Sequence, residues 1–454
     1  MKGIVLAGTT SGVGKTTLTA GVIGALRALG YRVAPFKVGP DYIDPTYHAK
    51  AAGRPCHNLD SWMLRHDALR DVFVRATADA DIAIVEGVMG LFDGRTGGGE
   101  AGSTAEVAKL LGLSIVLVVD VAKVARSVGA LVLGYQQFDP ALRMAGVILN
   151  NVASASHAAI CREAIVAATG LPVLGALMRD EALRAPERHL GLIPTVEGRV
   201  AETYFETAAA NVAAQVDLPA LLECASSPSM ASWQAPEGLW PARASRSRVP
   251  IAVAQDEAFS FTYSENLALL EAWGAEVLPF SPLHDARVPE GARGVLLGGG
   301  FPELYAEGLA SNGAMLASVR DAANRGVPIY AECGGLMYLG ESLTDTEGRP
   351  HAQAGIVALR SSMSRARLTL GYREATARAD GPHVVRGQTV RGHEFHWSTL
   401  DAPPEPGTAA YDLGESATAE GWARENVWAS YVHLHFASDV RLAPRLVATC
   451  EGVR

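Results

Sequence analysis

The sequence predicts an α/β fold made of two different domains, each built on a largely parallel sheet. In the first half, apolar runs that end in polar or Gly-rich turns recur, and helical patterns lie between most of them. This order is typical of a parallel sheet that is covered on both faces. The runs are RVAPFKVG, DIAIVEG, SIVLVVD, AGVILNN and LPVLGAL. A second α/β pattern begins at PIAVAQD and continues through EVLPF, GVLLGGG and VPIYAECGGLMYLG.

A change in composition separates the two patterns. The segment CASSPSMASWQAPEGLWPARASRSRVP is rich in Ser, Pro and Ala and has little periodicity, as linkers do. A chain of 454 residues is long enough for two or three domains, each with its own core. We therefore expect a first domain over 1–223, a linker over 224–249 and a second domain over 250–454.

Composition excludes several classes of protein. The chain has 39 basic and 48 acidic residues, a net charge of -9, and no long basic run, so nucleic acid is not an expected partner. No apolar run reaches membrane-spanning length, and the N-terminus enters a strand without a signal peptide. Five scattered cysteines without metal-like spacing indicate reduced thiols. We expect a cytoplasmic protein that binds no membrane.

The stretch LAGTTSGVGKTTLTAG carries the parts of a phosphate-binding loop between a strand and a helix. Gly12 and Gly14 let the backbone curl around phosphates, Lys15 reaches the outer phosphates, and the Thr16 hydroxyl suits Mg²⁺, with Thr17 beside it. The first glycine of the motif stands one residue earlier than in the commonest pattern. The loop lies at a helix N-terminus, where anions are favoured, and it predicts ATP binding.

Acidic and basic side chains follow two further strands at the same predicted sheet edge. FKVGPDYIDP places Lys37, Asp41 and Asp44 there, and IVEGVMGLFDG adds Glu86 and Asp93. The carboxylates can hold Mg²⁺ together with the P-loop threonine, or they can position a substrate carboxyl group for phosphorylation. For Asp93, in a Gly-flanked turn, an exposed acidic loop is a serious alternative.

The second domain contains a candidate thiol nucleophile. Cys333 follows an apolar strand and precedes a helical pattern, as at a nucleophile elbow, although a buried structural thiol is the alternative. His433 and His435 in WASYVHLHFAS are two residues apart, so both are expected on one face of a strand, where either can serve as base. Backbone N–H groups of GGGFPE, 298–303, can hold an oxyanion.

These motifs together resemble the cobyrinic acid a,c-diamide synthase family over nearly the whole chain. GTTSGVGKTT, FKVGPDYIDP, VEGVMGLFDG, GGGFPE, AECGGLMYL and SYVHLHF stand in order. The resemblance implies a dethiobiotin synthetase-like P-loop domain joined to a glutamine amidotransferase domain. By position in the motif it makes His433 the base, with His435 in reserve. Many amidotransferases have a Glu two residues after the base, where this chain has His435, so no orienting acid is identified.

The implied reaction is ATP- and glutamine-dependent amidation of the a and c acetate groups of cobyrinic acid or hydrogenobyrinic acid, through acyl phosphates. The resemblance assigns Cys333, His433, Asp41 and Glu86 to catalysis and Thr16, Asp41 and Glu86 to Mg²⁺. It places Lys37 and Asn150 with ATP, Asn150 at the adenine. The expected contacts with the corrinoid polycarboxylate are Tyr42, Ile43, Asp44 and Asp93, with Arg365, Arg367 and Arg373 as further candidates.

Two other functions and one assembly are kept open. The chain could be a P-loop regulatory ATPase with an inert amidotransferase-like domain, which the Cys333 and His433 pair argues against. It could instead amidate another tetrapyrrole, such as nickel-sirohydrochlorin. A homodimer is the assembly considered.

Overall fold

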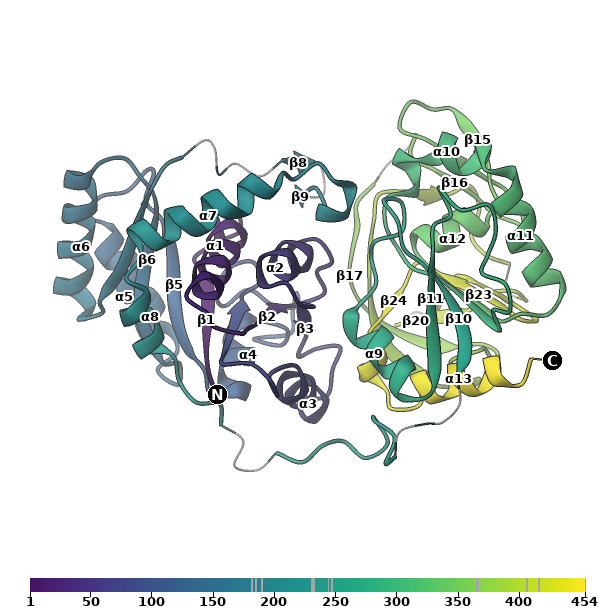
Figure 1. The fold of residues 1–454 in the computed structure, drawn as a ribbon, viewed down its shortest axis with the longest axis horizontal. Helices are drawn as coiled ribbons and strands as arrows, with labels where there is room; N and C mark the ends of the chain where they lie inside the picture. The colour runs from purple at the N-terminus through teal and green to yellow at the C-terminus, as the bar shows by residue number, and fades with distance from the viewer. Residues whose placement is uncertain are drawn as a thin grey trace. The chain divides into compact units, whose positions relative to one another are not determined.

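The computed structural model shows two compact units, Met1–Ala235 and Pro236–Arg454 (Figure 1). The structure describes residues 1–180, 183, 186–188, 191–229, 233–243, 245, 248–364, 367–405, 407–414 and 417–453. The division falls inside the segment predicted as a linker. Residues at both ends of that segment pack against the unit to which they belong. Ser226 pairs with Gly3 in the first unit, and Leu239 is buried and accepts a hydrogen bond from Trp273 in the second.

The first unit is a seven-stranded parallel sheet with the order β3-β2-β4-β1-β5-β6-β7. Its strands are β1 (Lys2–Gly8), β2 (Val33–Val38), β3 (His57–Leu59), β4 (Ile82–Glu86), β5 (Ser114–Asp120), β6 (Met144–Val152) and β7 (Val173–Met178), with a short pair β8 (Glu187–Arg188) and β9 (Gly191–Leu192). Its helices are α1 (Lys15–Ala28), α2 (Asp44–Ala52), α3 (His66–Ala76), α4 (Thr104–Leu111), α5 (Val128–Phe138), α6 (Ala155–Thr169), α7 (Glu202–Gln215) and α8 (Leu218–Cys224).

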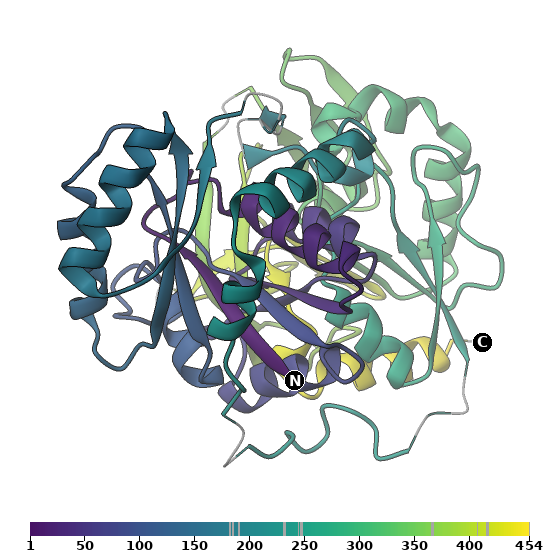
Figure 2. The same cartoon turned by 60° about the vertical axis from the view of Figure 1, so that its left-hand side comes forward.

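This sheet is buried on both faces, as the continuous apolar runs predict. The consecutive residues Ile4, Val5 and Leu6 point to alternate faces, and all are 0% exposed. Helices α1 and α7 lie side by side against one face (Figure 2). They approach closely at Gly21, where a Cβ atom would lie 2.8 Å from the backbone oxygen of Ala208. The packing holds the N-terminus of α1 at the sheet edge where β1 ends.

The second unit contains a six-stranded sheet, order β11-β10-β12-β13-β23-β22, in which only the β22–β23 pair is antiparallel. The strands of this sheet are β10 (Val249–Ala254), β11 (Ala275–Phe280), β12 (Gly294–Leu297), β13 (Ile329–Glu332), β22 (Trp422–Arg424) and β23 (Val427–Ser430). The helices are α9 (Ser264–Ala272), α10 (Ala306–Ser311), α11 (Gly313–Asn324), α12 (Gly334–Leu339) and α13 (Leu442–Glu451).

Two smaller sheets complete the second unit. One has the order β15-β14-β16-β19 and the other β21-β20-β17-β18-β24. Their strands are β14 (Ser342–Thr344), β15 (Pro350–Ala352), β16 (Arg360–Ser362), β17 (Thr369–Ala377), β18 (Thr389–His396), β19 (Thr399–Leu400), β20 (Tyr411–Leu413), β21 (Thr418–Glu420) and β24 (His433–Leu434). The antiparallel β17–β18 pairing places His393 directly opposite Tyr372, and β18 in turn pairs His393 with His433.

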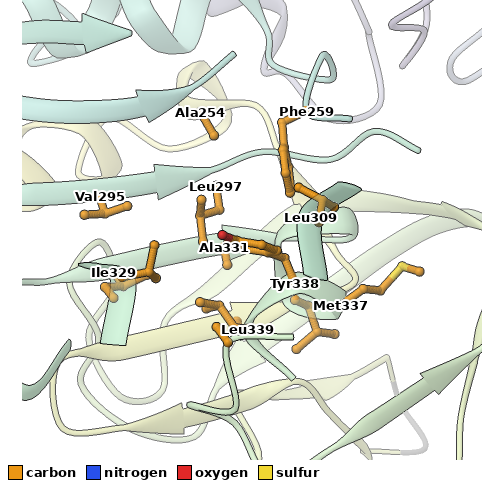
Figure 3. Close-up of a cluster of buried hydrophobic side chains, with 14 of the residues drawn as sticks. Ala254, Phe259, Val295, Leu297, Leu309, Ile329, Ala331, Met337, Tyr338 and Leu339 are labelled. Atoms are coloured by element: carbon orange, nitrogen blue, oxygen red, sulfur yellow. The ribbon is translucent and has the colours of Figure 1, made fainter. Parts of the chain in front are cut away.

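The core of the second unit surrounds β13 and α12. Figure 3 shows Leu297 of β12, Ala331 of β13 and Tyr338 of α12 in one apolar cluster. Phe259 packs edge-on against Tyr338, with ring centroids 5.4 Å apart. This cluster fixes the turn between β13 and α12, where Cys333 lies.

Among the residues that the structure describes, no helix is long and apolar enough to cross a membrane.

Candidate active sites

The P-loop lies between β1 and the N-terminus of α1, as predicted. Gly12 and Gly14 have φ values of 76° and 86°, which glycine adopts without strain. The ammonium group of Lys15 donates to the carbonyl oxygens of Thr10 (3.1 Å) and Met89 (2.6 Å). Burial, and after it the neighbouring Lys37, lowers the pKa of Lys15. The Lys15 side chain is therefore folded back over the P-loop at the edge of the sheet.

Glu86, at the end of β4, is the centre of a buried polar network. Its Oε1 accepts hydrogen bonds from Lys37 Nζ (2.9 Å) and from Thr16 Oγ1 (3.1 Å). Its Oε2 contacts Nε2 of His48, a residue of α2 that is 0% exposed. Burial opposes the charge of Glu86, but Lys37 and His48 outweigh it and hold the pKa of this carboxylate below its usual range.

The acidic residues after β2 surround the same lysine. Asp44 Oδ2 lies 2.5 Å from Lys37 Nζ, and Asp41 Oδ2 lies 3.8 Å from it. Asp41 Oδ1 also accepts the backbone N–H groups of Ile43 and Asp44, just before and at the first residue of α2. Burial and the neighbouring Asp44 raise the pKa of Asp41. Glu86, Asp41, Thr16 and Lys37 are thus brought together, as the sequence predicts.

Other predicted residues of this unit make contacts that differ from the expectation. Asn150 Nδ2 donates to the carbonyl oxygen of Val13, so it supports the P-loop backbone. Thr17 Oγ1 lies 2.8 Å from the hydroxyl of Tyr204 on α7. Asp93 is exposed, and its Oδ2 accepts the N–H of Gly90 in the same turn.

The two apolar residues expected at the corrinoid are buried in the structure. Tyr42 is 7% exposed and Ile43 is 6% exposed. Asp44, expected at the same substrate, is engaged with Lys37. The loop holds Asp41 and Asp44 around Lys37, and the contact of Tyr42 and Ile43 with a macrocycle stays a prediction.

In the second unit, Cys333 occupies a strained elbow between β13 and α12. Its φ is 46° and its ψ is −101°, which is unusual for a residue with a side chain. Gly335 allows the following helix to approach β12, because a Cβ atom there would lie 2.3 Å from the carbonyl oxygen of Leu297. Burial, and after it the carboxylate of Glu303, raises the pKa of the Cys333 thiol, so a base is needed to form the thiolate.

The triple glycine 298–300 brings a backbone donor to this elbow. Gly299 N and Phe301 N donate to the carbonyl oxygens of Phe261 and Ala258, respectively. Gly300 N donates to no other group in the described part of the chain, and it lies 3.2 Å from the position of a Cβ built on Gly334. The Gly334 N–H points at the thiol sulfur and favours its ionised form. The Gly334 N–H thus lies beside the sulfur, and Gly300 N lies beside Gly334.

The two histidines of SYVHLHF have different polar neighbours in the structure. β24 contains only His433 and Leu434, and His435 begins a 3₁₀ turn over Phe436–Ser438. His435 Nδ1 accepts the N–H of Ala437, and its Nε2 faces Glu265 at 3.6 Å. β24 ends after Leu434, but the backbone at His435 is still extended, with φ −93° and ψ 116°, so the shared face of the two histidines stays a prediction.

His433 has the surroundings of the base. Its imidazole packs against the triple-glycine loop, since a Cβ on Gly299 would lie 2.4 Å from His433 Cε1. Its Nδ1 lies 3.5 Å from Glu332 Oε2. His393 stacks on it, with ring centroids 4.9 Å apart and an angle of 18° between the planes. Sequence reasoning treats His393 as structural and leaves out Glu332 and His48.

The arginines proposed for the corrinoid are placed differently. Arg373, on β17, donates to the Glu394 carboxylate across the β17–β18 pair. Arg367 is exposed, and its backbone N–H donates to the carbonyl oxygen of Trp397. Arg365 lies outside the described residues.

One chain thus contains a P-loop sheet and a second unit with the Cys333 elbow and the buried imidazole of His433. Together these features define an enzyme that couples nucleotide use to a glutamine amidotransferase site. The family descriptions agree. A CobQ/CobB/MinD/ParA nucleotide binding domain matches residues 4–193, and a CobB/CobQ-like glutamine amidotransferase domain matches residues 250–440.

The full-length relatives narrow this class. The cobyrinate a,c-diamide synthase of Dehalococcoides mccartyi (strain ATCC BAA-2266 / KCTC 15142 / 195) is 44% identical over 99% of this chain and 98% of its own. The hydrogenobyrinate a,c-diamide synthase of Streptomyces coelicolor is 42% identical over 99% of this chain and 97% of its own. The chain belongs to the cobyrinate/hydrogenobyrinate a,c-diamide synthase family. A solved structure, PurLQS from Thermotoga maritima, has 13% identity and a TM-score of 0.34 over 44% of this chain and 97% of its own.

Proposed function

We propose that this protein amidates the a and c acetate carboxylates of cobyrinic acid or hydrogenobyrinic acid, with glutamine as nitrogen donor and ATP as activator. The observation that carries the proposal is the pairing of two sites in one chain: Lys15, Thr16, Lys37 and Glu86 at the P-loop, and Cys333 with His433 at the elbow. Relatives of both names align over the full length of the chain, which supports a corrinoid substrate.

The synthetase step overcomes the low reactivity of a carboxylate. A carboxylate repels nucleophiles and has no usable leaving group, so its oxygen attacks the γ-phosphorus of ATP and ADP leaves. Lys15 and Lys37 offset the negative charge of the transferring phosphoryl group. Ammonia then attacks the acyl phosphate, phosphate departs, and the amide forms after loss of a proton.

The Thr16 hydroxyl and the Glu86 and Asp41 carboxylates are oxygen donors of the kind that Mg²⁺ prefers. Among the described residues, no group of three or more His, Cys, Asp and Glu side chains is arranged to hold a metal ion. This agrees with Mg²⁺ chemistry, in which one or two protein carboxylates share the ion with phosphate oxygens and water. When bound there, Mg²⁺ would neutralise charge on the phosphates and orient them.

The amidotransferase step releases ammonia. His433 takes the proton of the Cys333 thiol, and the thiolate attacks the side-chain carbonyl carbon of glutamine. The N–H groups of Gly300 and Gly334 hold the oxyanion that forms. Histidinium returns its proton to the leaving nitrogen, ammonia departs, and water hydrolyses the thioester to glutamate. This acid and base exchange needs one imidazole that can reach both groups.

The acceptor and the order of amidation are tested together. The purified protein is incubated with ATP, Mg²⁺ and glutamine and with cobyrinic acid, hydrogenobyrinic acid or nickel-sirohydrochlorin, and products are separated by mass over time. We expect a monoamide to accumulate and leave before the diamide forms, because one phosphorylating site handles two acetates in succession. Diamide without free monoamide contradicts the stepwise scheme, and product only from nickel-sirohydrochlorin contradicts the corrinoid assignment.

Location and assembly follow from the same resemblance. We propose a cytoplasmic enzyme, since ATP, glutamine and reduced thiols are available there. A homodimer is a proposal that sedimentation of the purified protein tests.

A further inference from the structure

Glu332 connects the nucleophile and the base of the amidotransferase site. It is the last residue of β13 and directly precedes Cys333. Its Oε2 lies 3.5 Å from His433 Nδ1. Its Oε1 accepts the backbone N–H of Leu434 at 2.9 Å and the hydroxyl of Tyr330. One side chain therefore contacts the imidazole and fixes the strand that carries it.

The position of this carboxylate determines which imidazole nitrogen can act as base. A carboxylate only accepts hydrogen bonds, so a neutral His433 facing it is favoured with its proton on Nδ1. The lone pair then lies on Nε2, the nitrogen that can accept a proton from a thiol. The negative charge also stabilises the imidazolium that forms when the thiolate is made. Glu332 is 5% exposed, so water screens this interaction little.

Three other buried acids of this unit face other groups. Glu265 faces His435. Glu394 is paired with Arg373, and Glu420 accepts Ser430 Oγ and the N–H of Tyr431. Glu332, by contrast, has its Oε2 3.5 Å from His433 Nδ1.

We propose that Glu332 is the positioning residue of the amidotransferase site, which orients His433 toward the Cys333 thiol and stabilises its charged form. This inference rests on the proposed roles of Cys333 and His433. It supplies the acid that the sequence comparison with other amidotransferases leaves unassigned, from the residue before the nucleophile instead of a residue after the base.

The charged and titratable groups near His433 affect the pH profile of glutaminase activity. Glu332 faces its Nδ1, and His393 stacks on its ring. Burial, and after it His433, holds the pKa of His393 well below its usual range, so His393 stays neutral. Arg373 acts on His393, and Glu303, Glu332 and Glu394 each raise the pKa of Cys333. Glu332 is the group of this set that directly opposes Nδ1.

The test compares Glu332→Gln with Glu265→Gln, a matched change of a buried acid that faces the other histidine. Glutaminase kcat, KM and the pH profile of kcat/KM are measured on the full chain. For Glu332→Gln we expect kcat to fall roughly 10²- to 10⁴-fold with KM nearly unchanged, because the amide can donate to Nδ1 and favour the wrong tautomer. The acidic limb of the residual profile moves to lower pH, since imidazolium loses a neighbouring charge. Glu332→Asp restores part of kcat.

Three outcomes overturn the proposal. Glutaminase of Glu332→Gln within about threefold of wild type is one, and equal losses in both Gln variants with no shift of the acidic limb is another. If Glu332→Gln does not fold, ¹⁵N-histidine spectra of the wild-type protein decide, because a neutral His433 protonated on Nε2 contradicts the proposal. Cys333→Ala serves as a separate control: retained glutaminase in that variant overturns the proposed nucleophile itself, whereas an inert Glu332→Gln change overturns only the positioning role.

Discussion

The Gly300→Ala change tests whether the triple-glycine loop supplies an oxyanion donor. Gly300 has a φ of 154°, and a Cβ atom there would lie 2.1 Å from the carbonyl oxygen of Ala258 and 2.8 Å from its carbon. Both atoms are backbone, so the loop itself must move. A shift of that kind takes the Gly300 N–H away from the position near Gly334. Losing one oxyanion donor costs about 2.7–4 kcal/mol of transition-state stabilisation, or roughly 10²- to 10³-fold in kcat.

The assay follows glutamate release from glutamine, with ammonium-dependent amidation measured in parallel. We expect Gly300→Ala to lower glutaminase by that factor and to leave ammonium-dependent amidation near the wild-type rate. Gly313→Ala is the matched control, because a Cβ atom there meets nothing within 4 Å and the residue starts α11. A folded Gly300→Ala variant with glutaminase within about threefold of wild type would refute the reasoning.

Three further predictions concern the synthetase site, the two histidines and a buried acid. Glu86→Gln should lower amidation with ammonium by several powers of ten, as loss of a contact of roughly 3–4 kcal/mol does, while glutaminase persists; normal amidation would remove Glu86 from the site. His433→Gln should abolish glutaminase and His435→Gln should reduce it less than about tenfold, since His435 is engaged with Ala437 and Glu265; the reverse order in kcat would exchange their roles. Burial raises the pKa of Glu420 from 4.5 to about 7, so the folded state holds an extra proton between these values and stability falls as pH rises through this window. The loss is on the order of 3 kcal/mol, and Glu420→Gln should remove it in unfolding experiments at pH 5 and pH 8; an unchanged pH dependence would show that this carboxyl is not the source.

The local sequence pattern was sufficient to predict the main sheets, the P-loop and the Cys333 elbow. Apolar runs predict β2, β4, β5, β6 and β7, because a strand buried on both faces is apolar throughout. The P-loop and the Cys333 elbow are likewise local, since each is a strand, a turn and a helix in succession. The three-residue strand β3 and the two- and three-residue strands of the small sheets lack this signal, because short strands carry too few residues for a period.

Contacts between distant residues could not be predicted in the same way. Glu332 accepts the N–H of Leu434, which lies 102 positions later in the sequence. This contact exists only in the folded unit, where β24 is paired with β18. His48 lies one turn after Asp44 on α2, which is the only local sign that it faces the site. The sequence pattern does not indicate a partner for Arg373, but in the structure this side chain pairs with Glu394 on the neighbouring strand.

The central claim is that Cys333 only supplies ammonia to a separate ATP-dependent step, and Cys333→Ala tests it most directly. The variant and the wild-type protein are given cobyrinic acid, ATP and Mg²⁺ with either glutamine or a high concentration of ammonium salt, and amide products are measured by mass. The account predicts no product from glutamine and amidation near the wild-type rate from ammonium. A folded variant that loses both activities, or one that still uses glutamine, would contradict it.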